Sequence, residues 1–270
     1  MPAPSISVVI PTVRADQHLW AALDSVLAQT GVDLEVVLVA DGIELEPRHV
    51  PSDDRVRVIK HEHRQGTPAA LNSGLRASRG EFIARLDADD LAMPGRLERQ
   101  LEEMRHRPEL VCLGSSAQLI DDASRFLGTL EVVVGVEQIK STLLKRNPLV
   151  HSSVMMRRLS LESVGGYDED CARMQDYDLF LRLADIGDID NLPDALTSYR
   201  IHPGQFSRLT SPWSTSMRTV LRSRRRLAGS LGNFPLSQAL RDALWFAAQV
   251  ARHMQVARPG YMRRANSKPR

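Results

Sequence analysis

The sequence predicts an α/β fold in which a mostly parallel sheet is flanked by helices on both faces. Three observations predict it. Short β-rich segments alternate with helical patterns through the first 90 residues, as in repeated strand–helix–strand units. The first segment, residues 6–10, is continuously apolar, as expected of a strand buried on both faces. The chain of 270 residues is 43% hydrophobic and 25% charged, which is ordinary for a globular protein.

The first half contains four predicted strands and two predicted helices. Apolar residues recur at helical spacing in residues 16–29, and Gly31 ends that helix. In the second helix, residues 67–78, Thr67 is expected to cap the free N–H groups and Pro68 to begin the first turn. The strands are expected at residues 6–10, 34–39, 56–59 and 82–86.

Beyond residue 90 the pattern changes to α+β. Short strands are expected on either side of a turn at Asp121-Asp122, and residues 196–200 are expected to form the last strand of the body. The other expected elements are helices at residues 94–107, 136–144 and 175–186 and a strand at residues 152–156.

Composition excludes several classes of protein. Wholesale disorder, collagen and coiled coil are excluded, and the apolar runs are far shorter than the roughly 20 residues that span a bilayer. The N-terminus lacks the regions of a signal peptide. Cys112 and Cys171 are far apart and form no CxxC, so neither a disulfide framework nor a structural zinc site is expected. A cytoplasmic location is the resulting expectation.

Candidate binding residues follow three of the predicted strands. Pro11-Thr12 follows the first, Asp41-Gly42 the second and Asp87-Ala88-Asp89-Asp90 the fourth, and ligands of open α/β sheets lie outside these strand ends. Three carboxylates within four residues repel one another unless a cation or basic groups neutralise them. Their hard oxygens suit Mg²⁺ or Mn²⁺, which would also bind substrate phosphates. A solvated acidic turn that caps the next helix is the alternative.

Other metal-binding and phosphate-binding motifs fit the sequence less well. An EF-hand is excluded because Leu91 and Ala92 stand where a ligand and the turn glycine are required, and a phosphatase nucleophile would follow the first strand. The chain has no P-loop and no GxGxxG. His61-Glu62-His63 could form a metal pair, but it is not HExxH, and a loop contact is the simpler interpretation.

Together these motifs resemble the family 2 glycosyltransferases, which have the nucleotide-diphospho-sugar transferase (GT-A) fold. Each string is weak alone, but they occur in the family's order across roughly 200 residues. The strings are ISVVIPTVR (6–14), SVLAQT (25–30), LEVVLVADG (34–42), GTPAALNSGLRASRGEFIARLDADD (66–90), MPGRLERQ (93–100), NPLVHSSVMMRR (147–158), GGYDED (165–170), QDYDLFLRLA (175–184) and YRIHPGQFS (199–207).

The resemblance implies a nucleotide-sugar site at the strand ends. The Pro11-Thr12 turn and Asp41 would hold base and ribose, with Asp41 accepting from a pyrimidine N3–H. The family usually has another acidic residue where this chain has Ala40. Gly66 would also lie at the donor site.

The resemblance also implies a metal and a base. Asp87, Ala88 and Asp89 form the DxD motif, and Asp89 matches the residue that contacts Mg²⁺ or Mn²⁺ directly. His202 would reach the metal or the diphosphate. Asp176 matches the general base, in a Gln-Asp variant of the usual Glu-Asp pair. A single base implies inversion at the anomeric carbon.

Three further positions have structural alternatives. His151 either lines the acceptor site or is a satisfied polar residue, while Asn72 and the turn at residues 165–167 are expected to be structural. Asp178, two residues after Asp176 on the predicted helix, is expected to point away from it.

The implied reaction is metal-dependent transfer from a nucleotide diphosphate sugar, with a preference for UDP, to a glycan or lipid-linked acceptor. A sugar-nucleotide pyrophosphorylase is one alternative, although PTVRAD lacks the glycine-rich loop of those enzymes. A non-catalytic nucleotide-sugar-binding protein is the other. Nucleic acid is not an expected partner, because the body is acidic and the basic tail carries no recognised motif.

The expected domains are a GT-A body at 1–214, with a donor half at 1–90 and an acceptor half at 91–214, and a basic helical extension at 215–270. The extension carries a formal charge of +11 and the body −9. Its apolar stripe could lie on an anionic membrane at the inner face, or pack on the acidic body or a second subunit. The stripe comprises Leu236, Leu240, Ala243, Leu244, Ala247, Val250, Ala251 and Met254.

Overall fold

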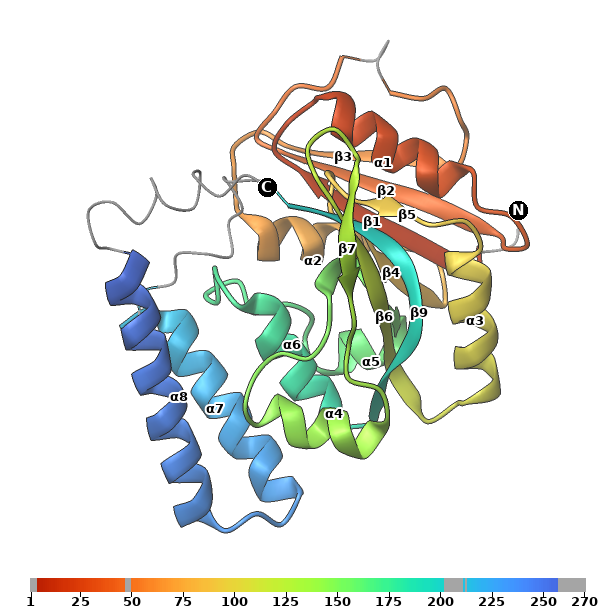
Figure 1. Ribbon diagram of the computed structural model, residues 1–270. Coiled ribbons are helices and arrows are strands. Elements are labelled where there is room, and N and C mark those ends of the chain that lie inside the picture. Colours follow the sequence, from red (N-terminus) through yellow and green to blue (C-terminus); the bar gives the residue numbers. More distant parts are fainter. Residues whose placement is uncertain (1–3, 47–49, 202–210, 212, 257–270) are drawn as a thin grey trace.

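Four parallel strands form the first half of the sheet, in the order β3-β2-β1-β4. The computed structural model describes residues 4–46, 50–201, 211 and 213–256 (Figure 1). The strands are β1 (Ile6–Thr12), β2 (Leu34–Asp41), β3 (Val56–His61) and β4 (Phe82–Arg85), and helices α1 (Gln17–Leu27) and α2 (Thr67–Ala77) connect them. The predicted strand–helix order is confirmed.

Alternate residues of the central strands enter two different cores. Val8 and Ile10 of β1 pack with α1 and α3 (Arg96–His106), whereas Val9 packs with α2 on the opposite face. Burial on both faces explains why these strands read as continuous apolar runs. Asp16 caps α1 by accepting from the backbone N–H groups of the first turn.

The predicted cap of α2 is wrong. The helix begins at Thr67 itself, and Gly66, with φ of 97°, occupies the capping position without any side-chain hydrogen bond. The turn needs positive φ, which glycine adopts without the strain that a Cβ would bring. Pro68 lies in the first turn as expected.

The second half of the sheet is mixed. Strand β8 (Met155–Arg157) pairs antiparallel with β4 and β6 (Leu110–Ile120), and β6 pairs parallel with β9 (Asp188–Arg200). The edge strands β5 (Leu91–Ala92) and β7 (Phe126–Leu130) pair with β9 and β6. The remaining elements are α4 (Val136–Leu143), η2 (His151–Ser153), α5 (Arg158–Ser163) and α6 (Gln175–Ala184).

Two predicted strands differ from the structure. Residues 152–156 begin as the 3-10 helix η2, because the Ser153 hydroxyl donates to the Val150 carbonyl and so favours a turn before β8 begins. The last strand is 13 residues long rather than five. Its first part was missed because Asp188, Asp190 and Asn191 interrupt the apolar pattern.

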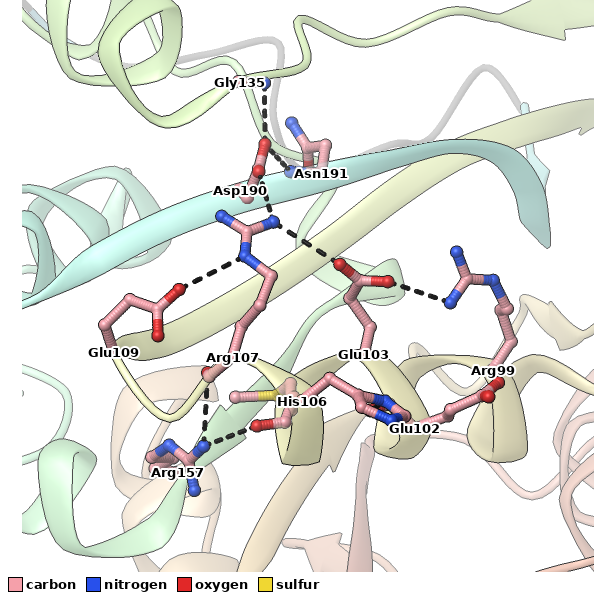
Figure 2. Close-up of polar contacts among 11 residues, drawn as sticks. Arg99, Glu102, Glu103, His106, Arg107, Glu109, Gly135, Arg157, Asp190 and Asn191 are labelled. Atoms are coloured by element: carbon pink, nitrogen blue, oxygen red, sulfur yellow. Dashed lines mark hydrogen bonds and ion pairs between the residues drawn. The ribbon is translucent and has the colours of Figure 1, made fainter.

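A polar network holds the beginning of β9 against the end of α3 (Figure 2). Asp190 accepts a charge-assisted hydrogen bond from Arg107 Nη1 at 2.8 Å, and its other oxygen accepts from the Gly135 and Asn191 N–H groups at 2.7 and 2.8 Å. Arg107 also contacts Glu109 at 3.3 Å. Asp190 therefore connects α3, β9 and the turn before α4.

We expect Asp190→Ala to lower the free energy of unfolding by about 2–4 kcal/mol, because it leaves two backbone N–H groups without their acceptor and removes the shortest ion pair of Arg107. Urea unfolding followed by circular dichroism measures the loss. Glu109→Ala is the matched control, since this exposed partner of Arg107 is expected to change stability by less than about 1 kcal/mol. Equal effects of the two variants would contradict the account.

The C-terminal helices α7 (Thr215–Ser230) and α8 (Pro235–Val256) form a hairpin beside α6, with α7 between α6 and α8 (Figure 1). Met217, Val220 and Leu227 of α7 are buried in the core. The Ser223 hydroxyl donates to Asp178 at 2.6 Å, and Asp178 also pairs with Arg182, so it is enclosed in the α6–α7 contact.

The apolar stripe of α8 does not pack on the body. Leu236, Leu240 and Leu244 are exposed, while Gln238 and Asp242 are buried on the opposite side of the helix. The predicted packing of this stripe on the body is therefore wrong, because polar residues of α8 find partners on α7. The expected pairing of arginines with carboxylates of the body occurs at Arg226, which pairs with Asp185, whereas Arg225 pairs with Asp242 of α8 within the extension.

Within the described residues, none of the helices is both long enough and apolar enough to cross a bilayer.

Candidate active site

The strand ends of the first half, η2 and the beginning of α6 surround a cavity of about 1070 Å³. Adjacent parallel strands bring residues after β1, β2 and β4 to one edge of the sheet, as predicted. The predicted residues that line this cavity are Pro11, Thr12, Asp41, Asp87, Ala88, Asp89 and Asp176. Gly66 does not line it, and its N–H group instead donates to Asp41.

Asp41 holds the loop that leads into α2. Its carboxylate accepts from the Gln65 and Gly66 N–H groups at 2.7 and 2.9 Å and from His61 Nδ1 at 2.9 Å. Burial opposes the charged form, but these donors outweigh it and lower the pKa of Asp41. Asp41 is thus an ionised acceptor at the cavity wall.

His61 is an internal partner of Asp41. Its second ring nitrogen lies 2.9 Å from the Ser73 hydroxyl, so both nitrogens of the buried ring are used. These contacts do not support the metal-pair interpretation of His61-Glu62-His63, and His61 lies at the end of β3 rather than in a loop.

The turn after β1 is closed by Thr12. Its hydroxyl donates to the Arg14 carbonyl at 2.6 Å and accepts from the Arg14 N–H at 3.2 Å. This local pair of bonds bends the chain away from the sheet and leaves Pro11 and Thr12 at the cavity.

Two features reduce the repulsion among the carboxylates of the acidic turn, residues 87–90. Arg85 of β4 pairs with Asp87. Burial favours the neutral acid at Asp87, but the guanidinium outweighs it and lowers the pKa of this carboxyl. Asp90 is buried, and burial together with the neighbouring carboxylates of Asp87 and Asp89 raises its pKa well above the usual value. Burial and like charge therefore favour the protonated form of Asp90, whereas Arg85 favours the charged form of Asp87.

Arg200 at the end of β9 anchors the acidic turn. Its N–H donates to Asp90 and its Nε to the Asp89 carbonyl, both at 2.7 Å, and Nη1 donates to the Asp121 carbonyl at 2.7 Å. The Ser152 hydroxyl of η2 accepts from the Asp87 N–H at 2.9 Å. Elements from the second half of the chain thus hold the turn that follows β4.

Arg85 is a buried cation beside Asp87. It is only 2% exposed, and among the described residues its Nε and Nη1 atoms have no hydrogen-bond partner. Arg85 also lines the cavity. Arg85 was not among the predicted site residues because it lies in an apolar strand, although an arginine two residues before an acidic turn is itself a signal.

Asp176 faces the same cavity from the beginning of α6. The preceding capping residue, Met174, has φ of 56°, an uncommon conformation that marks a constrained turn. Asn147 Nδ2 donates to Asp176 Oδ2 at 2.9 Å. Burial raises the pKa of Asp176; the Asp87 charge adds to this, while the backbone N–H groups of Asp176 and Tyr177 oppose it. The result is a more basic carboxylate than an ordinary aspartate.

His151 is neutral and also lines the cavity. Its Nε2 lies 2.9 Å from the Tyr167 hydroxyl, and burial lowers the pKa of the ring to about 3. His151 is therefore a satisfied polar residue that lines the cavity, and its place at the acceptor site stays a prediction. Asn72 is structural as expected, since its side chain donates to the Tyr167 carbonyl and accepts from the Tyr167 N–H.

Asn147 and Arg200 are two further residues of the site that the sequence did not predict. Both act through contacts with residues distant in the chain, at separations of 29 residues for Asn147–Asp176 and 110 for Arg200–Asp90. Within the described residues, no cluster of three or more His, Cys, Asp or Glu side chains is placed to hold a metal. His202 lies outside the described residues.

Comparison with known proteins agrees with this geometry. Residues 7–165 match the family described as Glycosyl transferase family 2. An uncharacterized glycosyltransferase of Methanocaldococcus jannaschii is 31% identical over 210 residues, covering 74% of this chain and 72% of the relative. The O-antigen biosynthesis glycosyltransferase WbnJ of Escherichia coli is 32% identical over 208 residues, covering 73% of this chain and 80% of the relative.

The fold is also found in a solved structure. The structure of S. aureus TarS 1–349 in complex with UDP matches with a TM-score of 0.63 at 19% identity, covering 95% of this chain and 74% of that chain. The mixed sheet, its flanking helices and the helical C-terminal region thus have a GT-A counterpart. With the family match across more than half of its residues, this chain belongs to glycosyltransferase family 2.

Proposed function

We propose that this glycosyltransferase moves a sugar from a nucleoside diphosphate sugar, with UDP as the preferred nucleotide, to an acceptor hydroxyl with inversion at the anomeric carbon. The observation that carries the proposal is the shared cavity. Asp87 and Asp89 line it from the first half of the sheet, and Asp176 lines it from α6. The proposed site for the leaving diphosphate, at Asp87 and Asp89, and the proposed base, Asp176, thus line the same cavity.

The residues at the acidic turn fit Mg²⁺ or Mn²⁺. Asp89 and Asp87 present only oxygen donors to the cavity, and Mg²⁺ is usually held by one or two carboxylates together with waters and substrate phosphates. Asp89 would be the main ligand, as its match to the second acidic residue of the family's DxD motif implies, and Asp87, which pairs with Arg85, would lie beside it. A bound cation would neutralise charge that develops on the departing diphosphate.

Asp176 would remove the proton of the acceptor hydroxyl. As that oxygen bonds to the anomeric carbon, the bond from this carbon to the diphosphate breaks and the nucleoside diphosphate leaves with the electron pair. Arg85, which pairs with Asp87 and lines the cavity, adds a positive charge that suits the anionic diphosphate of the nucleotide sugar. Asp41 and the turn at Pro11-Thr12 would hold the nucleoside.

The relatives support a role in glycan assembly. WbnJ is described as an O-antigen biosynthesis enzyme, and another relative, 27% identical over 191 residues, is the chondroitin synthase of Escherichia coli. The TarS structure contains UDP, which supports the preference for uridine. We therefore propose polysaccharide or glycolipid synthesis with a glycan or lipid-linked acceptor.

Incubation with a panel of UDP-, GDP- and dTDP-sugars plus Mn²⁺ tests the proposal. Release of nucleoside diphosphate is expected, and fastest from a UDP-sugar. Pyrophosphate-dependent exchange would instead indicate a pyrophosphorylase, and absence of any turnover would indicate a binding protein.

The pH dependence of turnover tests the base. Because Asp176 must be deprotonated and its pKa is raised, the turnover rate is expected to rise with pH through an acid limb above the usual range of an aspartate. Asn147→Ala removes a donor to the charged form, so the limb should move to higher pH by about 0.5–1 unit. Asn233→Ala, at a distant asparagine, is the control and should leave the limb unmoved. A limb that does not respond to Asn147→Ala would argue against Asp176 as the titrating group.

A further inference from the structure

Helix α8 presents an apolar face to solvent. The outer face of α8 is defined here by Leu236, Leu240, Leu244 and Met254, which are 86%, 63%, 64% and 61% exposed. Phe234, in the turn before the helix, extends it and is 80% exposed. These residues recur at positions that share one side of a helix, so they form a continuous stripe. An apolar stripe of this length marks an interaction surface.

The orientation of α8 is set by its inner face. Asp242 accepts from Arg225 Nε and from Gln238 Nε2, both at 2.8 Å, and the buried Arg224 guanidinium lies 4.6 Å from the Trp245 ring centre. Rotating the helix to bury the leucines would break these contacts and expose Trp245. The apolar stripe therefore faces outward because the polar side of the helix is the side that binds α7.

Positive charge accompanies this apolar face. Arg218, Arg222, Arg225 and Arg226 are exposed on α7, and only Arg225 and Arg226 form ion pairs with described residues. Residues 257–270 add five Arg or Lys and no acidic residue to the sequence. An apolar stripe in the same segment as excess Arg and Lys is the combination by which amphipathic helices bind anionic lipid surfaces.

We propose that the α7–α8 hairpin docks on an anionic phospholipid bilayer, with the outer face of α8 entering the interface and the arginines contacting lipid headgroups. A second copy of the chain is a poorer occupant, because stacking two such faces would bring two segments of +11 formal charge together.

Docking through α8 would connect the bilayer with the active site. Trp245 and Gln249, on the inner side of the same helix, line the cavity that contains Asp176. One helix thus contacts the cavity with one side and solvent with the other. If the proposed function holds, the acceptor hydroxyl belongs to a lipid-linked glycan, although docking itself does not depend on that function.

Cosedimentation of the full chain with vesicles tests the docking. Phosphatidylcholine vesicles with about 25 mol% phosphatidylglycerol, at about 0.1 M salt, are compared with phosphatidylcholine alone. Binding to the anionic vesicles is expected to be at least about tenfold tighter. The double variant Leu240→Glu/Leu244→Glu should lose at least about tenfold in binding to them, because two charges enter the apolar face.

The control variant is Leu159→Glu/Ile186→Glu, which alters two apolar residues of the body that are 73% and 47% exposed. It should bind like the original chain. Circular dichroism checks that each variant is folded, and nucleoside diphosphate release from a UDP-sugar without vesicles separates docking from the proposed function. Equal binding to neutral vesicles, no binding at all, or an unchanged Leu240→Glu/Leu244→Glu variant would overturn the proposal. A dimer that this variant dissociates, with no vesicle binding, would assign the face to a second copy.

Discussion

Asp176→Asn is expected to lower the turnover rate by about 10²–10⁴-fold, because it removes the proposed proton acceptor at nearly constant shape. Asn147, which donates to the carboxylate, is expected to stay close to the amide that replaces it. Affinity for the nucleotide should change little, since Asp176 lies on α6, away from the strand ends proposed to bind the nucleoside and the diphosphate. Steady-state release of nucleoside diphosphate and calorimetric titration with UDP measure the two quantities.

Asp178→Asn is the matched control on the same helix. Asp178 is buried between Arg182 and Ser223, so its replacement should lower the melting temperature while the turnover of folded molecules changes far less. Turnover of Asp176→Asn at the level of the original chain would transfer the role of base to another group.

Asp89→Asn is expected to remove most activity and to weaken nucleotide binding together, because this carboxylate is the proposed main ligand of the divalent cation. A loss of at least about 10²-fold in turnover is expected. Adding EDTA to the original chain should reproduce the loss, and excess Mn²⁺ should restore the original chain more completely than the variant.

Asp54→Asn serves as its control, since Asp54 is an exposed aspartate that does not line the cavity. It should leave both turnover and the response to EDTA unchanged. Undiminished turnover of Asp89→Asn in the presence of EDTA would rule out the metal at this turn.

The first half of the fold was predictable because its signals are local. Strands buried on both faces appear as continuous apolar runs, and the residues after them necessarily meet at one edge of a parallel sheet. For this reason Asp41, Asp87 and Asp89 could be assigned to one site from the sequence. Asp176 could be assigned to the same site only from the family resemblance, because no local sequence pattern relates α6 to β4.

What the sequence did not predict depends on partners far along the chain. Asp190 interrupts an apolar pattern, yet it lies within β9 because Arg107 supplies its counter-charge. Arg85 lies in an apolar strand, and its role appears only beside Asp87 and the cavity. On α8 the hydrophobic stripe was identified correctly, but its direction was not, because Asp242 is buried against Arg224 and Arg225.

The stereochemistry of the first sugar released tests the central claim most directly. With water as acceptor and an α-linked UDP-sugar as donor, proton NMR can record the anomeric configuration before the free sugar equilibrates. A single base at Asp176 facing a diphosphate held at Asp87 and Asp89 predicts the β-anomer as the initial product. Initial release of the α-anomer would require an additional nucleophile in the cavity and would contradict the account.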